Sequence, residues 1–256
     1  PGETERVVRE SVEYLHEAFR KSPVRASNWS TPIWYLMSDY FLQALREVHR
    51  RFERIEVDRL RVKPVVKITG EFYLQTVEGA PNYNIHHWLE QEGAEVYPAA
   101  ITIWLEYLMR HAGQDYEDHI GIARHARLKF GAVRTGMQLL RRTYDGMRRA
   151  LGELPHEMPD QYELRSLAAP YYHSRLNGGE GDMLIGKVLW AYHHKKAHMI
   201  CELSPYSCMP NTMSVGAMAA VTGSSSPAMK RWMQLSTKTR PICASVLHSA
   251  NLTRAF

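Results

Sequence analysis

One short segment, ELSPYSCMPNTMS at residues 202–214, places a cysteine between a predicted strand end and a predicted helix start. Pro205 has no N–H for a strand ladder, and Pro210 disfavours helix at the residue before it. Cys208 is therefore expected on a turn, with Asn211 as the N-cap of the next helix. A helix N-terminus favours a thiolate, the form that binds metals and attacks electrophiles. A metal ligand, a nucleophile, half of a disulfide and a small buried side chain all remain open roles.

The cysteine count narrows these roles. The chain has three cysteines among 256 residues, at positions 201, 208 and 243. An odd number argues against a secreted disulfide framework and favours a reducing, cytoplasmic location. The disulfide interpretation of Cys208 is therefore disfavoured.

A second group of candidate residues follows a predicted buried strand. The apolar, β-branched run KPVVKITGEF reaches Gly70, which predicts a turn there and puts Glu71 directly after the strand. Asn82 or Asn84 is the predicted N-cap of the helix in NYNIHHWLEQEGAEV. Ligands bind at the carboxyl edge of open parallel sheets. We therefore expect Glu71, Asn82 and Cys208 to lie at one such edge.

Two further motifs favour structural roles. Residues 181–188, GDMLIGKV, match the spacing of a phosphate-binding loop as far as Lys187, but Val188 replaces the magnesium-binding hydroxyl and no strand precedes the motif. The glycines of NGGEGD instead predict a tight turn before a helix, whose first amides face any nearby anion. His194 and His198 have the spacing of a metal pair, but no third ligand follows at a suitable distance.

The elements that must position these residues fall into three regions. Residues 1–62 have helical periodicity and form a helical leader, with helices over 3–20 and about 33–55. Residues 63–222 alternate strands and helices, with a helical insertion over 115–170. The Ser-, Thr- and Arg-rich residues 223–256 predict an irregular tail.

The middle region predicts an α/β fold with a parallel sheet. Strand, helix and strand follow one another within KPVVKITG to EVYPAAITIWL, which is the pattern of a βαβ unit. HMICELSP is the third predicted strand. Three strands are few for an open parallel sheet, so we expect the native sheet to be completed by chain outside these residues. The start at Pro1 instead of Met likewise predicts a fragment or a processed chain.

Composition excludes several functional classes. The formal net charge is +5, and acidic residues are interspersed through both basic stretches, REVHRRFERIEVDRLRVK and RTGMQLLRRTYDGMRR. This pattern favours solvated helix faces over a nucleic-acid footprint. No run of 18 apolar residues predicts a membrane span, and the first residues lack the features of a secretory signal.

Two stretches resemble a known family. KPVVKITGEFYLQTVEGAPNYNIHHWLEQEGAEVYPAAITIWL is similar to part of the large activator proteins of CoA-substrate enzymes, which belong with the 2-hydroxyacyl-CoA dehydratase and benzoyl-CoA reductase families. GGEGDMLIGK and ICELSPYSCMPN resemble the same proteins' GEG motif and cysteine turn. The resemblance covers roughly residues 60–222 and departs from the family pattern at about Ser224, where we hypothesise a reading-frame change or a truncation.

This resemblance implies a Rossmann-like fold and a cysteine-ligated iron–sulfur cluster of the [4Fe–4S] type. It also implies acyl-CoA dehydratase or reductase components as partners, with ATP bound by a separate activator domain. Carried across, Cys208 matches the family's turn cysteine and is a metal ligand, with Cys201 as a second candidate, and Gly70, Glu71 and Asn82 shape the cofactor pocket. A cubane cluster usually takes four thiolates, so this chain supplies an incomplete ligand set.

Two functions follow as hypotheses. The first is an iron–sulfur or activator-related component in ATP-driven, low-potential electron transfer to acyl-CoA dehydratase or reductase chemistry. The second is a non-catalytic interaction or scaffold module without a cluster, in which the helical leader and the 115–170 helices bind the partner. A third reading, a nucleotide site at the NGGEGD turn, is tested by measuring ATP binding.

Overall fold

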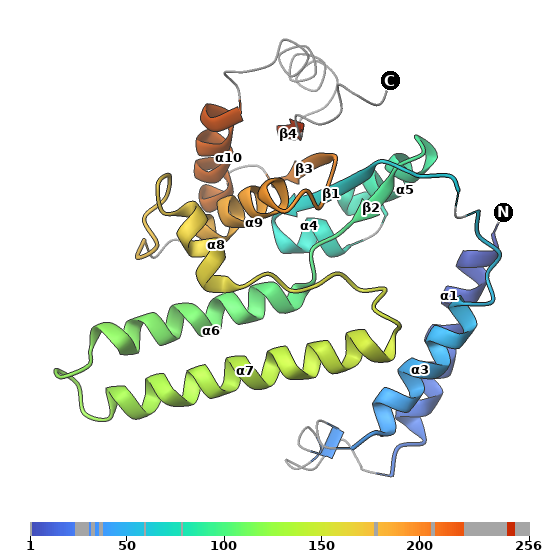
Figure 1. Ribbon diagram of the computed structural model, residues 1–256, viewed down its shortest axis with the longest axis horizontal. Coiled ribbons are helices and arrows are strands. Elements are labelled where there is room, and N and C mark those ends of the chain that lie inside the picture. Colours follow the sequence, from blue (N-terminus) through green and yellow to red (C-terminus); the bar gives the residue numbers. More distant parts are fainter. Residues whose placement is uncertain are drawn as a thin grey trace. The chain divides into compact units, whose positions relative to one another are not determined.

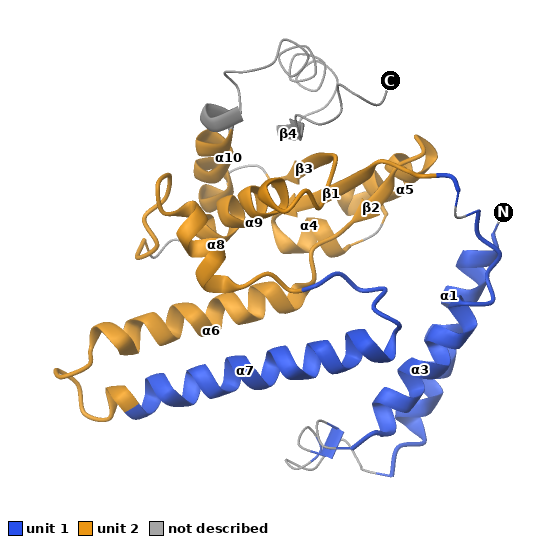
Figure 2. Cartoon of the chain, in the orientation of Figure 1, with its two compact units in different colours: residues 1–61, 128–157 blue, residues 62–127, 158–256 orange. Residues whose placement is uncertain are grey.

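The fold is taken from a computed structural model, which describes residues 2–23, 31, 34–35, 38–58, 60–77, 79–176, 179–205, 208–222 and 245–248. The chain forms two compact units (Figure 2). The first contains residues 1–61 and 128–157, and the second contains residues 62–127 and 158–256. Residues 128–157, which belong to the predicted helical insertion, thus group with the leader.

The first unit is helical. Helix α1 (Glu3–Arg20) packs on α3 (Tyr40–Phe52), and the 25-residue helix α7 (Ala126–Ala150) belongs mostly to this unit. Apolar residues at helical spacing on α1 and α3 face each other because one stripe of each amphipathic helix must be buried. The Tyr40 hydroxyl donates to the Ala18 carbonyl oxygen over 2.8 Å and fixes one end of the pair.

The second unit is built on a parallel sheet (Figure 1). Strands β1 (Val65–Gly70), β2 (Glu95–Tyr97) and β3 (Met199–Leu203) are parallel, in the spatial order β2-β1-β3. The predicted α/β class with an open, incomplete Rossmann-like sheet is confirmed. Within residues 223–256 the structure describes β4 (Ser245–His248), which pairs antiparallel with β3 and was not predicted.

Helices cover both faces of this sheet. Alternation along β1 and β3 sends one set of side chains, Val66, Ile68, Cys201 and Leu203, into an apolar cluster with Leu89 of α5 (Ile85–Gln91). Ile200 points to the other face and joins the larger core. That core is formed with α6 (Ile101–Asp118), α8 (Gln161–Ala168), α9 (Gly181–His193) and α10 (Met209–Thr222).

Three local expectations about these elements were wrong. The second strand ends at Tyr97, and Ile101–Leu105 start α6 because Pro98 has no N–H for further pairing. Helix α10 begins at Met209 with Pro210 in its first turn, a position that tolerates proline, so Asn211 is a helical residue and not the N-cap. The run MLIGKVLWAYHHKKA predicts a helix as far as Ala197, but α9 ends at His193, and Lys195 has a φ of +51°.

The sequence contains no run of 18 apolar residues that predicts a membrane span. In the structure, no helix among the described ranges combines the length and the apolarity that a membrane crossing requires.

Candidate functional site

The carboxyl ends of β1 and β3 meet at one carbonyl oxygen. Gly70 and Leu203 are register partners, and the Leu203 oxygen accepts from the Glu71 backbone N–H over 3.0 Å. The same oxygen accepts from Asn211 Nδ2 over 3.4 Å. The turn after β1 and the start of α10 are therefore joined, as expected of neighbouring parallel strands.

Cys208 lies between β3 and α10, as predicted. It directly precedes the first helical residue, and its carbonyl oxygen accepts from both the backbone N–H and the hydroxyl of Thr212, each over 2.8 Å. Its own N–H donates to the Pro205 oxygen over 3.3 Å. These hydrogen bonds fix the backbone of Cys208, and the residue is half-buried.

A third loop reaches the same edge. Gly179 has a φ of +99°, and a Cβ placed there would lie 2.4 Å from Cγ of Pro210. The Gly179 carbonyl oxygen accepts from the Tyr107 hydroxyl over 2.8 Å. The predicted glycine turn before α9 is therefore in close contact with the first turn of α10, and glycine is needed there for both backbone angle and space.

Glu71 and Asn82 use their polar groups to hold this edge together. Glu71 is the N-cap of α4 (Phe72–Thr76), and its carboxylate accepts from the Leu74 N–H over 3.1 Å. Asn82, in the short 3-10 helix Ala80–Asn82, is buried and its Nδ2 donates to the Val77 oxygen over 2.5 Å. Asn84 occupies the N-cap position of α5 without a side-chain cap bond. Glu71 and Asn82 thus stabilise loops around the edge, and Asn82 Oδ1 is buried without a hydrogen-bond partner among the described residues.

Cys201 does not share this edge. It lies inside β3, 4% exposed, in the apolar cluster with Ile68 and Leu203. Burial, and next the Glu202 carboxylate, raise the pKa of the Cys201 thiol to about 12. A metal ligand must be a thiolate, so this position suits a core residue better than a ligand.

The described residues fit a complete iron–sulfur cluster poorly. Among them, no group of three or more His, Cys, Asp or Glu side chains is arranged to hold a metal ion. Of the two cysteines that the structure describes, Cys208 is half-buried and Cys201 is buried, and Cys243 lies outside the described residues. A cluster at this edge therefore needs thiolates from outside the described residues.

The sequence analysis missed two buried lysines, one on β1 and one on α9. Lys67 of β1 is 2% exposed and its Nζ lies 3.6 Å from the centre of the Tyr97 ring, and Lys187 of α9 is 3% exposed. Burial, and next the Lys187 charge, lower the pKa of Lys67 to about 7. Burial lowers the pKa of Lys187 to about 8, although the Glu180 and Glu202 carboxylates oppose the shift. The available signal was a lysine inside each of two otherwise apolar segments, VVKITG and MLIGKVLW.

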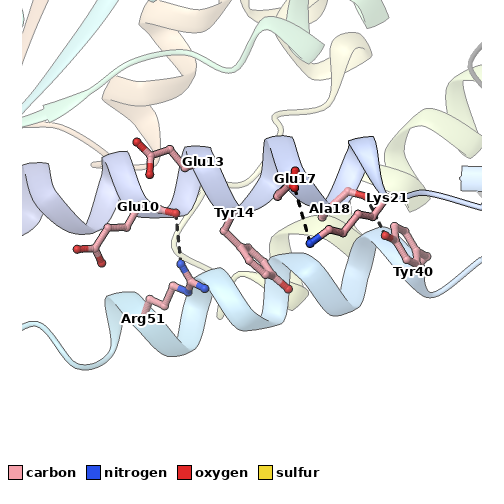
Figure 3. A pocket seen from close by; sticks show the side chains of 8 residues that line it. All are labelled: Glu10, Glu13, Tyr14, Glu17, Ala18, Lys21, Tyr40 and Arg51. Atoms are coloured by element: carbon pink, nitrogen blue, oxygen red, sulfur yellow. Dashed lines mark hydrogen bonds and ion pairs between the residues drawn. The ribbon is translucent and has the colours of Figure 1, made fainter.

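A wide surface groove lies in the first unit, between α1 and α3 (Figure 3). Three carboxylates of α1, Glu10, Glu13 and Glu17, line it. The Arg51 guanidinium of α3 lies 4.3 Å from the centre of the Tyr14 ring and donates to the Glu10 backbone oxygen over 3.3 Å. Lys21, whose Nζ lies 3.7 Å from the Glu17 carboxylate, also lines the groove, so the groove is an open surface of mixed charge and not an enclosed site.

Comparison with protein-family models, with curated proteins and with solved structures finds no match to this chain.

Proposed function

We propose that this chain is an iron–sulfur or activator-related component in ATP-driven, low-potential electron transfer to 2-hydroxyacyl-CoA dehydratase or benzoyl-CoA reductase type chemistry. In this role Cys208 is one cluster ligand, and the turns at Gly70–Glu71 and Gly179–Glu180 form the wall beside it. The partners are acyl-CoA dehydratase or reductase components, and the setting is the reducing cytoplasm.

The position of Cys208 is the observation that supports this proposal most. It is a half-buried thiol at the carboxyl edge of a parallel sheet, directly before the N-terminus of a 14-residue helix. That location favours negative charge, which a thiolate ligand and an anionic cluster both carry. The family resemblance of the GEF, GEG and CMPN motifs is independent of this placement, since it comes from residue identity alone.

The cluster would be completed by thiolates from a second chain or from residues outside the described ranges. Cys201 is excluded from our ligand set because binding would require the thiol to leave an apolar cluster and lose its proton.

Thiol protection tests this assignment within one sample. We expect alkylation with iodoacetamide to label Cys208 in the metal-free protein and to leave Cys201 unlabelled until the chain is denatured, because Cys208 is half-buried whereas Cys201 is 4% exposed. After anaerobic incubation with iron, sulfide and the partner components, labelling of Cys208 should fall sharply, as measured by peptide mass spectrometry. Equal labelling of Cys208 before and after incubation would contradict its role as a ligand.

The second candidate, a non-catalytic interaction or scaffold module, is favoured by the open groove between α1 and α3. Its charged lining, three carboxylates with Lys21 and Arg51, would suit a partner surface of complementary, mixed charge. A chain that folds normally, takes up no iron and binds a partner through this groove would support that function in place of the first.

A further inference from the structure

The long helix α7 carries a larger positive charge than the whole chain does (Figure 1). Its 25 residues include seven Lys and Arg and one acidic residue, Asp145, which gives a formal charge of +6, against +5 for all 256 residues. Acidic residues are interspersed through REVHRRFERIEVDRLRVK, but α7 has a single carboxylate. Pairing within the helix therefore cannot neutralise it.

The exposed arginines of α7 lie along one side of the helix. Arg134, Arg142 and Arg149 are exposed, and spacings of eight and seven residues return each to nearly the same side after two turns. The half-buried Arg141 and Arg148 directly precede the last two and widen the set to about a third of the helix circumference. We call these five residues the arginine row, which is about 22 Å long.

The side chains around the arginine row are mostly polar. Thr135, Gln138 and Asp145 lie among its arginines and are exposed. Leu139, 51% exposed, lies beside the row, but one such side chain does not make an apolar patch. Protein interfaces usually have an apolar or aromatic core, and a helix that lies in a membrane surface inserts an apolar face. The row therefore fits a partner that is recognised through its charge.

The use of arginine indicates phosphate as the partner's charged group. Every basic residue of the row is Arg, and a guanidinium group binds two phosphate oxygens at once. Sites for single strands stack bases on aromatic side chains. The aromatic residue of this stretch, Tyr144, is half-buried, and its hydroxyl donates to the His156 carbonyl oxygen over 2.6 Å. A double helix, whose bases are already stacked, is therefore favoured over a single strand.

We propose that the arginine row binds the phosphate backbone of double-stranded DNA, independently of base sequence. The major groove of B-form DNA admits an α-helix, whereas the major groove of duplex RNA is too narrow for protein side chains to read. The guanidinium groups contact phosphates along the row, and such contacts position a duplex without reading its bases. Asp145 opposes binding because its carboxylate repels phosphate. This inference goes beyond the electron-transfer proposal and requires no cluster.

The salt dependence of binding tests the proposal. Each phosphate contact contributes about −0.9 to the slope of log K against log salt concentration, so the wild-type slope on a duplex of about 20 base pairs should be about −4. The combined variant Arg134→Gln, Arg142→Gln and Arg149→Gln should make this slope less steep by about 2.7 and weaken binding at least about tenfold at about 50 mM salt. Fluorescence anisotropy of a labelled duplex measures both, with the metal-free chain.

The matched control removes the same charge from another part of the chain. Arg9→Gln, Arg20→Gln and Arg46→Gln combined change exposed positions of α1 and α3 and should leave the slope unchanged. Asp145→Asn should strengthen binding about twofold or more, a gain that misfolding cannot produce. Equal losses of affinity in the two triple variants, or an unchanged slope in the α7 variant, would overturn the proposal.

Other anions separate the classes of partner. Single-stranded DNA of the same length, duplex RNA, poly-L-glutamate and phosphatidylcholine vesicles with about 30% phosphatidylserine should each bind at least about tenfold more weakly than duplex DNA. Equal or tighter binding of the wild-type chain to any of these probes, or no detectable binding to duplex DNA, would refute the assignment. None of these readouts depends on Cys208, so this proposal and the iron–sulfur proposal can fail separately.

Discussion

Replacing Gly70 with alanine is expected to lower the free energy of unfolding by about 3–5 kcal/mol, the sum of backbone strain and a steric clash. Gly70 has a φ of +107°, and a Cβ there would lie 2.0 Å from the Leu203 carbonyl oxygen. That oxygen is the acceptor that joins Glu71 and Asn211 at the edge. The alanine methyl group must therefore separate the ends of β1 and β3.

Gly93→Ala is the matched control for this variant. Gly93 also has a positive φ, +86°, but nothing lies within 4 Å of a Cβ at that position. It should cost only the backbone strain, about 1–2 kcal/mol. Urea unfolding followed by far-UV circular dichroism measures both variants. An equal loss of unfolding free energy in Gly70→Ala and Gly93→Ala would contradict the close approach of Gly70 to Leu203.

Replacing Lys67 with methionine is expected to stabilise the protein most at low pH. The folded-state pKa of Lys67 is about 7, against the usual 10.5. Where Lys67 is charged in both the folded and the unfolded chain, its burial therefore lowers the free energy of unfolding by on the order of 5 kcal/mol. This full loss applies below pH 7. Between pH 7 and 10.5 only the unfolded chain binds the proton, so wild-type stability rises with pH across that window.

Lys67→Met removes this penalty and keeps the length of the side chain. At pH 6 the variant should be more stable than the wild type by about 1–4 kcal/mol, after the loss of the contact with the Tyr97 ring is included. The advantage should shrink as pH rises towards 10. Lys63→Met, at an exposed position, should show no such dependence. A wild-type advantage at pH 6, or a variant advantage that grows with pH, would contradict the buried position of Lys67.

The sequence was a good guide where local chemistry decides the structure. Strand β1 was predicted because a β-branched run ends at Gly70, and β3 because the short run HMICELSP ends at Pro205. The edge location of Cys208 followed from their parallel pairing. The turn at Gly179, before α9, followed from the glycines of that segment. Each of these signals is contained in a few consecutive residues.

The features that the sequence did not predict depend on contacts between distant segments. Ile103 and Tyr107 have the alternation of a strand and also the spacing of a helix, and packing on α8 and α9 selects the helix. Lys187 could be assigned to solvent or to the core only once α9 was packed over Lys67 and Glu202. The pairing of β4 with β3 joins segments more than 40 residues apart, which no local pattern encodes.

Anaerobic reconstitution with iron and sulfide tests the central claim, that Cys208 is a cluster ligand, most directly. Together with its partner components, which would supply the remaining thiolates, the wild-type chain should turn brown, with thiolate-to-iron absorbance and an electron paramagnetic resonance signal after reduction. Cys208→Ser should lose both while keeping its circular dichroism, and Cys201→Ser, the internal control, should retain both. A wild-type chain that stays colourless in the presence of its partner components, or a Cys208→Ser variant as brown as the wild type, would contradict the proposed function.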